Sequence, residues 1–222
     1  GKVSVNFSKL IKRISDTVDE ESAAIVRGHK QNKTLDFYPH EAKFISDKAL
    51  LVNNKKITAK KIFIAAGARS NIPPIEGLKD VPYMTSTEAL RNRKLPKKLI
   101  VIGGGYIACE LGHAYSALGS DVHFIVRKGR FLMREDKQVS ETFSKVFKKS
   151  HTVHIGYTPT KVSYKNKQFI VVMKRKNGKI KKIKGDGLLV ATGVKPNSDN
   201  LGLENTKIKP KKRGSIKQSR TQ

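Results

Sequence analysis

Three small residues at fixed spacing form the most informative motif of the chain. Gly103, Gly105 and Ala108 fit the Gly-x-Gly-x-x-Gly/Ala fingerprint of dinucleotide-binding proteins. In that fingerprint the first glycine permits a tight turn, the second lets the backbone approach a pyrophosphate, and the third position needs a small residue where a helix meets a strand. The amides at the start of the following helix would bind the pyrophosphate. The motif therefore predicts a dinucleotide site. The alternative is a turn that only joins two elements.

The elements around the motif have the order that the fingerprint requires. A short apolar run at residues 97–102 predicts a strand, helical residues follow to Leu118, and a second apolar run at 122–126 predicts the next strand. Strand, glycine turn, helix and strand together occupy about 30 residues, the size of one βαβ unit. This context favours the binding interpretation over a plain turn, because the fingerprint alone is weak.

The residues after the second strand favour one of the two nicotinamide cofactors. An acid at this point binds the ribose 2′-hydroxyl of NAD, whereas a basic residue accommodates the 2′-phosphate of NADP. No acid stands between Asp121 and Glu135. The basic residues of this stretch are Arg127, Lys128, Arg130 and Arg134. The sequence therefore predicts NADP(H), with NAD(H) as the alternative, although a chain this basic places Lys or Arg at many positions.

The remaining patterns predict an α/β chain. Apolar residues at helical spacing predict amphipathic helices at 7–28 and 136–149, the second with Val139, Phe143, Val146 and Phe147 on one face, and a short helix at 85–91 with Thr85 or Ser86 as its cap. Residues 71–77 are rich in proline and predict a linker. Apolar runs at 35–38, 42–45, 49–52 and 62–66 predict a β-meander, and further strands are expected at 153–155, 160–164, 168–173, 179–183 and 187–191.

Composition sets limits on the function. The 222 residues include 46 Lys and Arg against 18 Asp and Glu, a formal charge of +28, which attracts phosphates of any kind. The alternative function is therefore a nucleic-acid-binding module, suggested by the basic runs at 174–176, 179–184 and 207–213, although aromatic residues are not interleaved with these lysines.

No apolar run is long enough for a membrane span, so a soluble, cytoplasmic protein is expected without a membrane partner. One cysteine, Cys109, and six scattered histidines predict no metal site and no redox disulfide within the chain.

Several motifs in order resemble the class I pyridine nucleotide–disulfide oxidoreductases, the family of glutathione reductase, dihydrolipoamide dehydrogenase and mycothione reductase. Residues 62–67 with 73–77 resemble the crossover segment that leaves the flavin domain, 99–110 the nicotinamide fingerprint, and 188–193 the returning segment. The sequence around Arg127 and at residues 131–136 is most similar to that of mycothione reductase and its dihydrolipoamide-dehydrogenase-like relatives. The resemblance covers nearly the whole chain.

The resemblance implies roles for individual residues. Tyr106 would be the ring that covers a flavin until nicotinamide displaces it, and Glu110 the carboxylate near that flavin. Arg127 and Arg134 match the family's 2′-phosphate-binding arginines in type, and Gly193 closes the returning segment beside the cofactor. The family also implies FAD and a homodimer in the complete enzyme.

The departures from the family pattern define the expected domains. The family's flavin fingerprint, redox disulfide and interface domain have no counterpart in this sequence. We therefore expect a partial flavin-domain segment at 1–82, an NAD(P)H-binding domain with a Rossmann-type βαβ unit and a β-meander at 83–193, and a basic return segment at 194–222. The expected function is the NADPH-binding portion of a flavin-dependent disulfide oxidoreductase, which presents nicotinamide to FAD and is inactive alone as a disulfide reductase. A non-catalytic nucleotide-binding remnant is a further alternative.

Overall fold

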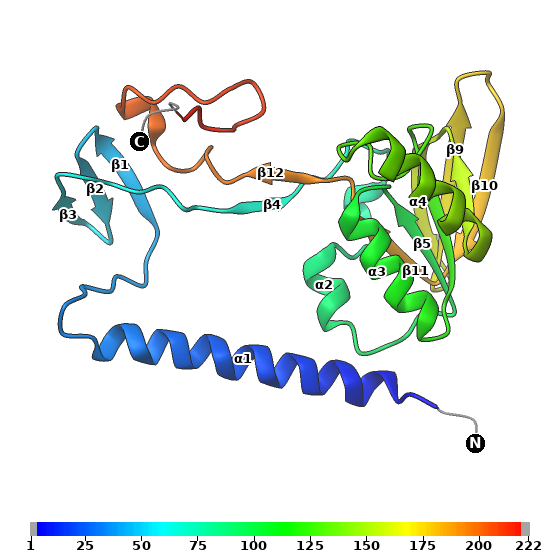
Figure 1. Cartoon of the computed structure of the whole chain (residues 1–222), viewed down its shortest axis with the longest axis horizontal. Coiled ribbons are helices and arrows are strands. Elements are labelled where there is room, and N and C mark those ends of the chain that lie inside the picture. Colours follow the sequence, from blue (N-terminus) through cyan, green and yellow to red (C-terminus); the bar gives the residue numbers. More distant parts are fainter. Residues whose placement is uncertain (1–3, 219–222) are drawn as a thin grey trace. The chain divides into compact units, whose positions relative to one another are not determined.

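The structure is a computed structural model that describes residues 4–218, and it divides into two compact units (Figure 1). The first unit comprises the chain up to Asp19 together with Ser70–Gly193. The second comprises Glu20–Arg69 and the chain from Val194 on. In the described part of the chain, no helix is both long and apolar enough to cross a membrane.

A four-stranded parallel sheet forms the centre of the first unit. Its strands, in spatial order, are β11 (Gly187–Val190), β5 (Lys98–Ile102), β6 (Asp121–Val126) and β7 (Thr152–Ile155). Every neighbouring pair is parallel. Parallel neighbours need crossover connections, and α3 (Tyr106–Ala117) joins β5 to β6 while α4 (Lys137–Ser150) joins β6 to β7. The expected Rossmann-type βαβ unit is confirmed, and the class is α/β.

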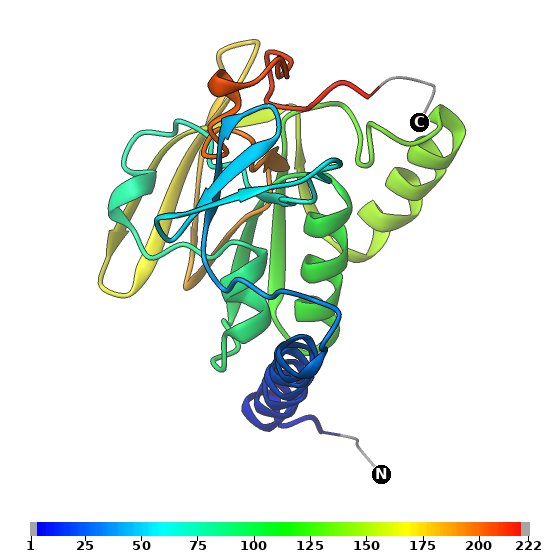
Figure 2. The same ribbon diagram turned by 90° about the vertical axis from the view of Figure 1, so that its left-hand side faces the viewer.

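Alternate residues of β5 enter two different cores, because successive side chains of a strand point to opposite faces. Leu99 and Val101 pack in a cluster with residues of α3 and α4, and Ile100 and Ile102 pack on the other face. Figure 2 shows the helices on one side of the parallel sheet and the long antiparallel strands on the other. The strand is therefore buried on both faces, which explains its uninterrupted apolar sequence.

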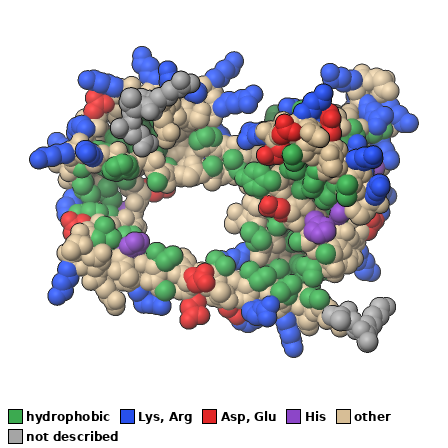
Figure 3. Space-filling view, in the orientation of Figure 1, with side chains coloured by type: hydrophobic (Ala, Val, Ile, Leu, Met, Phe, Trp, Pro, Cys, Tyr) green, Lys and Arg blue, Asp and Glu red, His purple; other side chains and the backbone are tan. Residues whose placement is uncertain are grey.

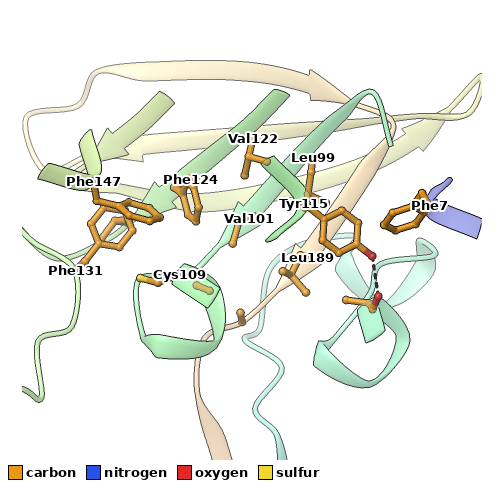
Figure 4. Close-up of a cluster of buried hydrophobic side chains, with 14 of the residues drawn as sticks. Phe7, Leu99, Val101, Cys109, Tyr115, Val122, Phe124, Phe131, Phe147 and Leu189 are labelled. Atoms are coloured by element: carbon orange, nitrogen blue, oxygen red, sulfur yellow. Dashed lines mark hydrogen bonds between the residues drawn. The ribbon is translucent and has the colours of Figure 1, made fainter. Parts of the chain in front are cut away.

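The helical side of the sheet holds an aromatic cluster (Figure 4). Phe124 lies edge-on to Phe131 and Phe147, with ring centroids 5.6 and 5.2 Å apart. At the other end of the cluster, Phe7 from α1 (Phe7–Gln31) contacts Tyr115. The Tyr115 hydroxyl donates to the carbonyl oxygen of Ala89 at 2.7 Å, the dashed line in Figure 4. Ala89 belongs to α2 (Ser86–Arg91), whose cap is Thr85, in a capping box with Glu88.

The second face of the parallel sheet is covered by a three-stranded antiparallel sheet. Its strands are β8 (Tyr157–Lys165), β9 (Gln168–Arg175) and β10 (Ile180–Gly185), with β9 in the middle. Val162, Val171 and Met173 are buried against Ile100 and its neighbours. The strands expected at 160–164, 168–173 and 179–183 are therefore present, each longer or shifted by a few residues.

The second unit contains the β-meander, but with different strands from those expected. It consists of β1 (Ala42–Ser46), β2 (Ala49–Val52) and β3 (Lys55–Thr58), paired antiparallel in that order. The predictions for 42–45 and 49–52 are confirmed, whereas those for 35–38 and 62–66 are wrong. The third strand begins just after Asn53 and Asn54, whose positive φ angles of 45° and 63° form the tight turn of a hairpin.

A second small sheet pairs two short strands that are far apart in the sequence. It pairs β4 (Ala68–Ser70) with β12 (Val194–Pro196). Beside it, the guanidinium of Arg69 binds both carboxylate oxygens of Asp199, and Lys195 binds the same carboxylate at 2.7 Å. The bond from Arg69 lowers the pKa of Asp199. The segments that the sequence separates by more than a hundred residues therefore lie side by side.

The interior face of α4 differs from the expected one. Val139 and Val146, which the helical pattern placed with Phe143 and Phe147, are 57% and 60% exposed. Phe147 is buried and Phe143 is partly buried, as expected, and Ser140 and Ser144 are buried in place of the two valines. The serines can face the core because their hydroxyls bond to the backbone of Phe131. The Ser140 hydroxyl donates to the carbonyl oxygen of Phe131, and the amide of Phe131 donates to the Ser144 hydroxyl at 2.9 Å.

Candidate dinucleotide site

The glycine turn lies between β5 and α3, where the fingerprint requires it. Gly103 has a φ of +145°, a conformation that L side chains rarely adopt, and a Cβ there would overlap the carbonyl oxygen of Ala191. The same hypothetical Cβ would lie 3.4 Å from the Cβ of Ala108, which is fully buried. The first and third positions of the fingerprint are therefore set by close packing in the protein itself.

Gly105 has a different environment. It is exposed, its φ is −86°, and a Cβ at this position would meet nothing within 4 Å. Close packing within the chain therefore does not require a glycine here, whereas the close approach of a pyrophosphate would. The position fits an external ligand.

The start of α3 can bind an anion. Gly105 is the cap of this helix, and no side chain in the described residues caps it. Its first backbone amides consequently keep unpaired N–H groups at the positive end of a 12-residue helix. A phosphate group at this end would receive these hydrogen bonds.

The basic loop after β6 is attached to the glycine turn. The amide of Leu132 donates to the carbonyl oxygen of Gly104 at 2.8 Å. Leu132 adopts a positive φ of 50°, which is unusual for a residue with a side chain. This contact, which the sequence did not indicate, brings the loop with the four predicted basic residues to the turn that would hold the pyrophosphate.

The four basic residues of the loop are not equivalent. Arg127 and Lys128, directly after β6, are exposed, as is Arg134. Arg130 is half-buried and donates from Nε to the Oγ of Ser140 at 2.8 Å. Its guanidinium is therefore oriented by α4, whereas the other three side chains can reach a ligand at the surface. The nearby acid Asp136 is engaged as the cap of α4.

Tyr106 and Glu110 occupy the first turns of α3, four residues apart. Tyr106 is 56% exposed and Glu110 is exposed. Residues four apart on a helix are surface neighbours, so the two side chains share one side of α3. Neither is used in the packing of the first unit, which leaves both available to a ligand.

Gly193 follows β11 at the same end of the parallel sheet as Gly103. Its φ is +111°, and its carbonyl oxygen accepts from the amide of Asn71 at 2.9 Å. The neighbouring Thr192 donates its hydroxyl to the carbonyl oxygen of Asn71. Gly193 is thus at the carboxyl end of the sheet, where ligands of open α/β sheets bind.

Cys109 and the histidines take no part in this arrangement. Burial, and to a lesser degree Glu110, raise the pKa of the Cys109 thiol to about 12. Over residues 4–218, no three His, Cys, Asp or Glu side chains lie together as metal ligands.

Comparison with known proteins shows the family of the chain. The sequence profile of the family described as pyridine nucleotide-disulphide oxidoreductase matches residues 2–222. The chain belongs to this family. It is 35% identical over 206 residues to a mercuric reductase of Staphylococcus aureus, covering 89% of this chain and 38% of the relative. It is 32% identical over 222 residues to a dihydrolipoyl dehydrogenase of Geobacillus stearothermophilus, covering 96% of this chain and 46% of the relative.

A solved structure shows the same fold. The flavoprotein disulfide reductase RclA of Escherichia coli superposes with a TM-score of 0.86 at 27% identity, covering 97% of this chain and 49% of RclA. The chain thus spans between about two fifths and a half of the length of these relatives. The expected resemblance to the pyridine nucleotide–disulfide oxidoreductases is confirmed.

Proposed function

We propose that this chain is the nicotinamide-binding portion of a flavin-dependent oxidoreductase and that it prefers NADPH. The observation that carries the proposal is the hydrogen bond from Leu132 to Gly104, because it joins the phosphate-binding turn and the basic loop into one site. The family membership of the chain supports the binding of a pyridine nucleotide.

Each part of the cofactor has a candidate partner in the chain. The pyrophosphate would bind the amides at the start of α3, beside Gly103 and Gly105. The 2′-phosphate would bind Arg127 and the other basic residues of the loop, Lys128, Arg130 and Arg134. A bound NADPH supplies the hydride. The residues of this chain bind and orient the cofactor.

Tyr106 and Glu110 are proposed to act where nicotinamide meets FAD. Their exposure and shared side of α3 suit a ring that shields a flavin and a carboxylate close to it. We propose Gly193 as a backbone position beside the cofactor. FAD would be held with the remainder of a complete enzyme, which we propose to be a cytoplasmic homodimer.

We propose no residue of this chain as a contact for the substrate that accepts the electrons. The relatives carry the names mercuric reductase, dihydrolipoyl dehydrogenase and disulfide reductase. Reduction of such acceptors by a cysteine pair would need cysteines other than Cys109, the one cysteine of this sequence, which is buried.

A calorimetric titration of the chain with NADPH and NADH tests the proposal. We expect saturable binding of both cofactors, tighter for NADPH. The NADPH affinity should fall only modestly between low and moderate salt, because pyrophosphate and ribose contacts add to the charge attraction. Absence of binding for both cofactors, or equal affinities, would contradict the proposed cofactor preference.

A further inference from the structure

The antiparallel sheet β8–β9–β10 carries an unbalanced charge. Residues 157–185 include nine Lys and one Arg, with no Asp or Glu. They therefore supply a large share of the formal charge of +28. None of these residues belongs to the dinucleotide site described above.

Strand pairing sorts this charge onto one face of the sheet. Residues that pair directly across strands share a face, and Val162, Val171 and Met173 mark the buried one. On the opposite face Lys182 pairs with Val172, Lys184 with Ile170, and Ile180 with Lys174. The outer face defined by this register consists of Thr158, Lys161, Ser163, Lys165, Gln168, Ile170, Val172, Lys174, Ile180, Lys182 and Lys184.

The lysines of this outer face are almost all without an acidic neighbour. Lys161 forms an ion pair with Glu76 at 2.6 Å. Lys165, Lys174, Lys182 and Lys184 are exposed, and within residues 4–218 none of them forms an ion pair. Figure 3 shows Lys and Arg side chains projecting from the side of the first unit where β9 and β10 lie in Figure 1. Charges of one sign that are not neutralised sum to a field that attracts polyanions.

Three of these lysines lie on two neighbouring strands of the outer face. Lys182 and Lys184 are two residues apart on β10, so roughly 7 Å separates their Cα atoms. Lys174 lies on the adjacent strand, at the end of the same face. Long flexible side chains on such a frame can contact several phosphates of one backbone at once.

We infer that the outer face of β8–β9–β10 binds double-stranded nucleic acid through its phosphate backbone, without sequence preference. Single-stranded nucleic acid is disfavoured because the outer face has no aromatic side chain on which bases could stack; Tyr164 packs against Phe169 instead. A membrane surface is disfavoured because Ile180, 61% exposed, is the one large apolar side chain fully available for insertion on this face.

Fluorescence anisotropy with a labelled duplex of about 25 base pairs and arbitrary sequence tests this inference over about 50 to 200 mM salt. The test variant combines Lys174→Gln, Lys182→Gln and Lys184→Gln. The matched control combines Lys43→Gln, Lys56→Gln and Lys212→Gln, which removes the same charge from exposed lysines of the second unit. Circular dichroism confirms that both variants fold.

The wild-type chain should bind the duplex, and the logarithm of its affinity should fall linearly with the logarithm of salt concentration. The test variant should lose roughly tenfold or more in affinity and about three units of that slope, since each phosphate contact contributes about 0.9. The control should lose much less, and a variant that combines Lys174→Arg, Lys182→Arg and Lys184→Arg should bind the duplex as the wild type does. NADPH binding by the test variant should be unchanged, which separates this inference from the proposed function.

Two results would overturn the inference. Equal losses of duplex affinity in the test and control variants would show that binding depends only on the total charge of the chain and not on this face. Binding to vesicles with about one third phosphatidylserine, without binding to the duplex, would assign the face to a membrane surface.

Discussion

Arg130 donates from its Nε to the Oγ of Ser140 at 2.8 Å, and Ser140 is fully buried in α4. The same hydroxyl donates its proton to the carbonyl oxygen of Phe131. One buried side chain thus fixes both the backbone of the basic loop and the direction of one of its arginines. Hydrogen bonds from α4 therefore hold the loop that is proposed to bind the 2′-phosphate.

Substitution of Ser140 by Ala should weaken this support. The carbonyl of Phe131 would lose its buried donor, and Arg130 would lose its acceptor, so we expect a loss of about 1–3 kcal/mol in unfolding free energy. The affinity for NADPH should fall severalfold and that for NADH should change less. Urea unfolding and calorimetry measure the two effects. Ser150→Ala, at the exposed end of α4, is the control and should change neither; an equal effect of the control would show that Ser140 has no special role.

Gly103 and Gly105 should respond differently to substitution by Ala. Gly103→Ala forces a Cβ onto the carbonyl oxygen of Ala191 in a conformation with positive φ, so we expect a loss of more than about 2 kcal/mol in unfolding free energy. Gly105→Ala has open space and ordinary φ, so stability should change by less than about 1 kcal/mol while the NADPH affinity falls at least tenfold. Unchanged NADPH affinity in Gly105→Ala would mean that no pyrophosphate approaches this position.

Local patterns predicted the central part of the fold. The strand, glycine turn, helix and strand from 97 to 126 depend on neighbouring residues, and the structure has each element where the sequence indicated it. Of the two predicted caps of the short helix, Thr85 and Ser86, the structure has Thr85, which forms a capping box with Glu88.

Features that depend on distant partners were missed. Residues 62–66 have the composition of a buried strand, but no described segment pairs with them, and Phe63 is 89% exposed. The strand β3 was missed because its sequence, Lys55-Lys-Ile-Thr58, has one large apolar residue. On α4 the hydrophobic pattern pointed to Val139 and Val146, since no local rule shows that two serines will satisfy the backbone of Phe131. The bond between Leu132 and Gly104 was invisible for the same reason.

The free energy of unfolding should decrease as the pH is lowered, because His154 is buried. This histidine is 7% exposed, and burial, followed by the nearby Lys181 and His123, lowers its pKa to about 4. An unfolded histidine has a pKa of about 6.5, so between these values the unfolded chain binds more protons. The contribution of His154 is therefore complete above about pH 6.5 and is lost as the pH falls to about 4, by up to about 3 kcal/mol.

Urea unfolding at a series of pH values, with the wild type and His154→Gln, measures this loss. The variant should show a flatter dependence of unfolding free energy on pH over this range. His29→Gln, which replaces an exposed histidine, is the control and should keep the wild-type slope. Identical slopes for all three proteins would exclude His154 as the cause.

Cys109 should be unreactive in the folded protein. Its thiol is buried and its pKa is raised to about 12, so at pH 8 the thiolate fraction is roughly a thousandfold below that of an unshifted thiol. A chromogenic disulfide reagent should therefore label Cys109 slowly in buffer and rapidly in urea, with Cys109→Ala as the blank. Rapid labelling of the folded chain would show that the thiol is accessible and available for chemistry.

The central claim is that a dinucleotide binds at the glycine turn with its 2′-phosphate against the basic loop. The most direct measurement is the ratio of NADPH to NADH dissociation constants for the wild type and for Arg127→Glu, determined by calorimetry at one salt concentration. The account predicts that the wild type prefers NADPH and that the variant loses at least about tenfold in NADPH affinity, because the new carboxylate repels the phosphate and suits a ribose hydroxyl. The NADH affinity should be kept or improved. An unchanged ratio in Arg127→Glu would contradict the account.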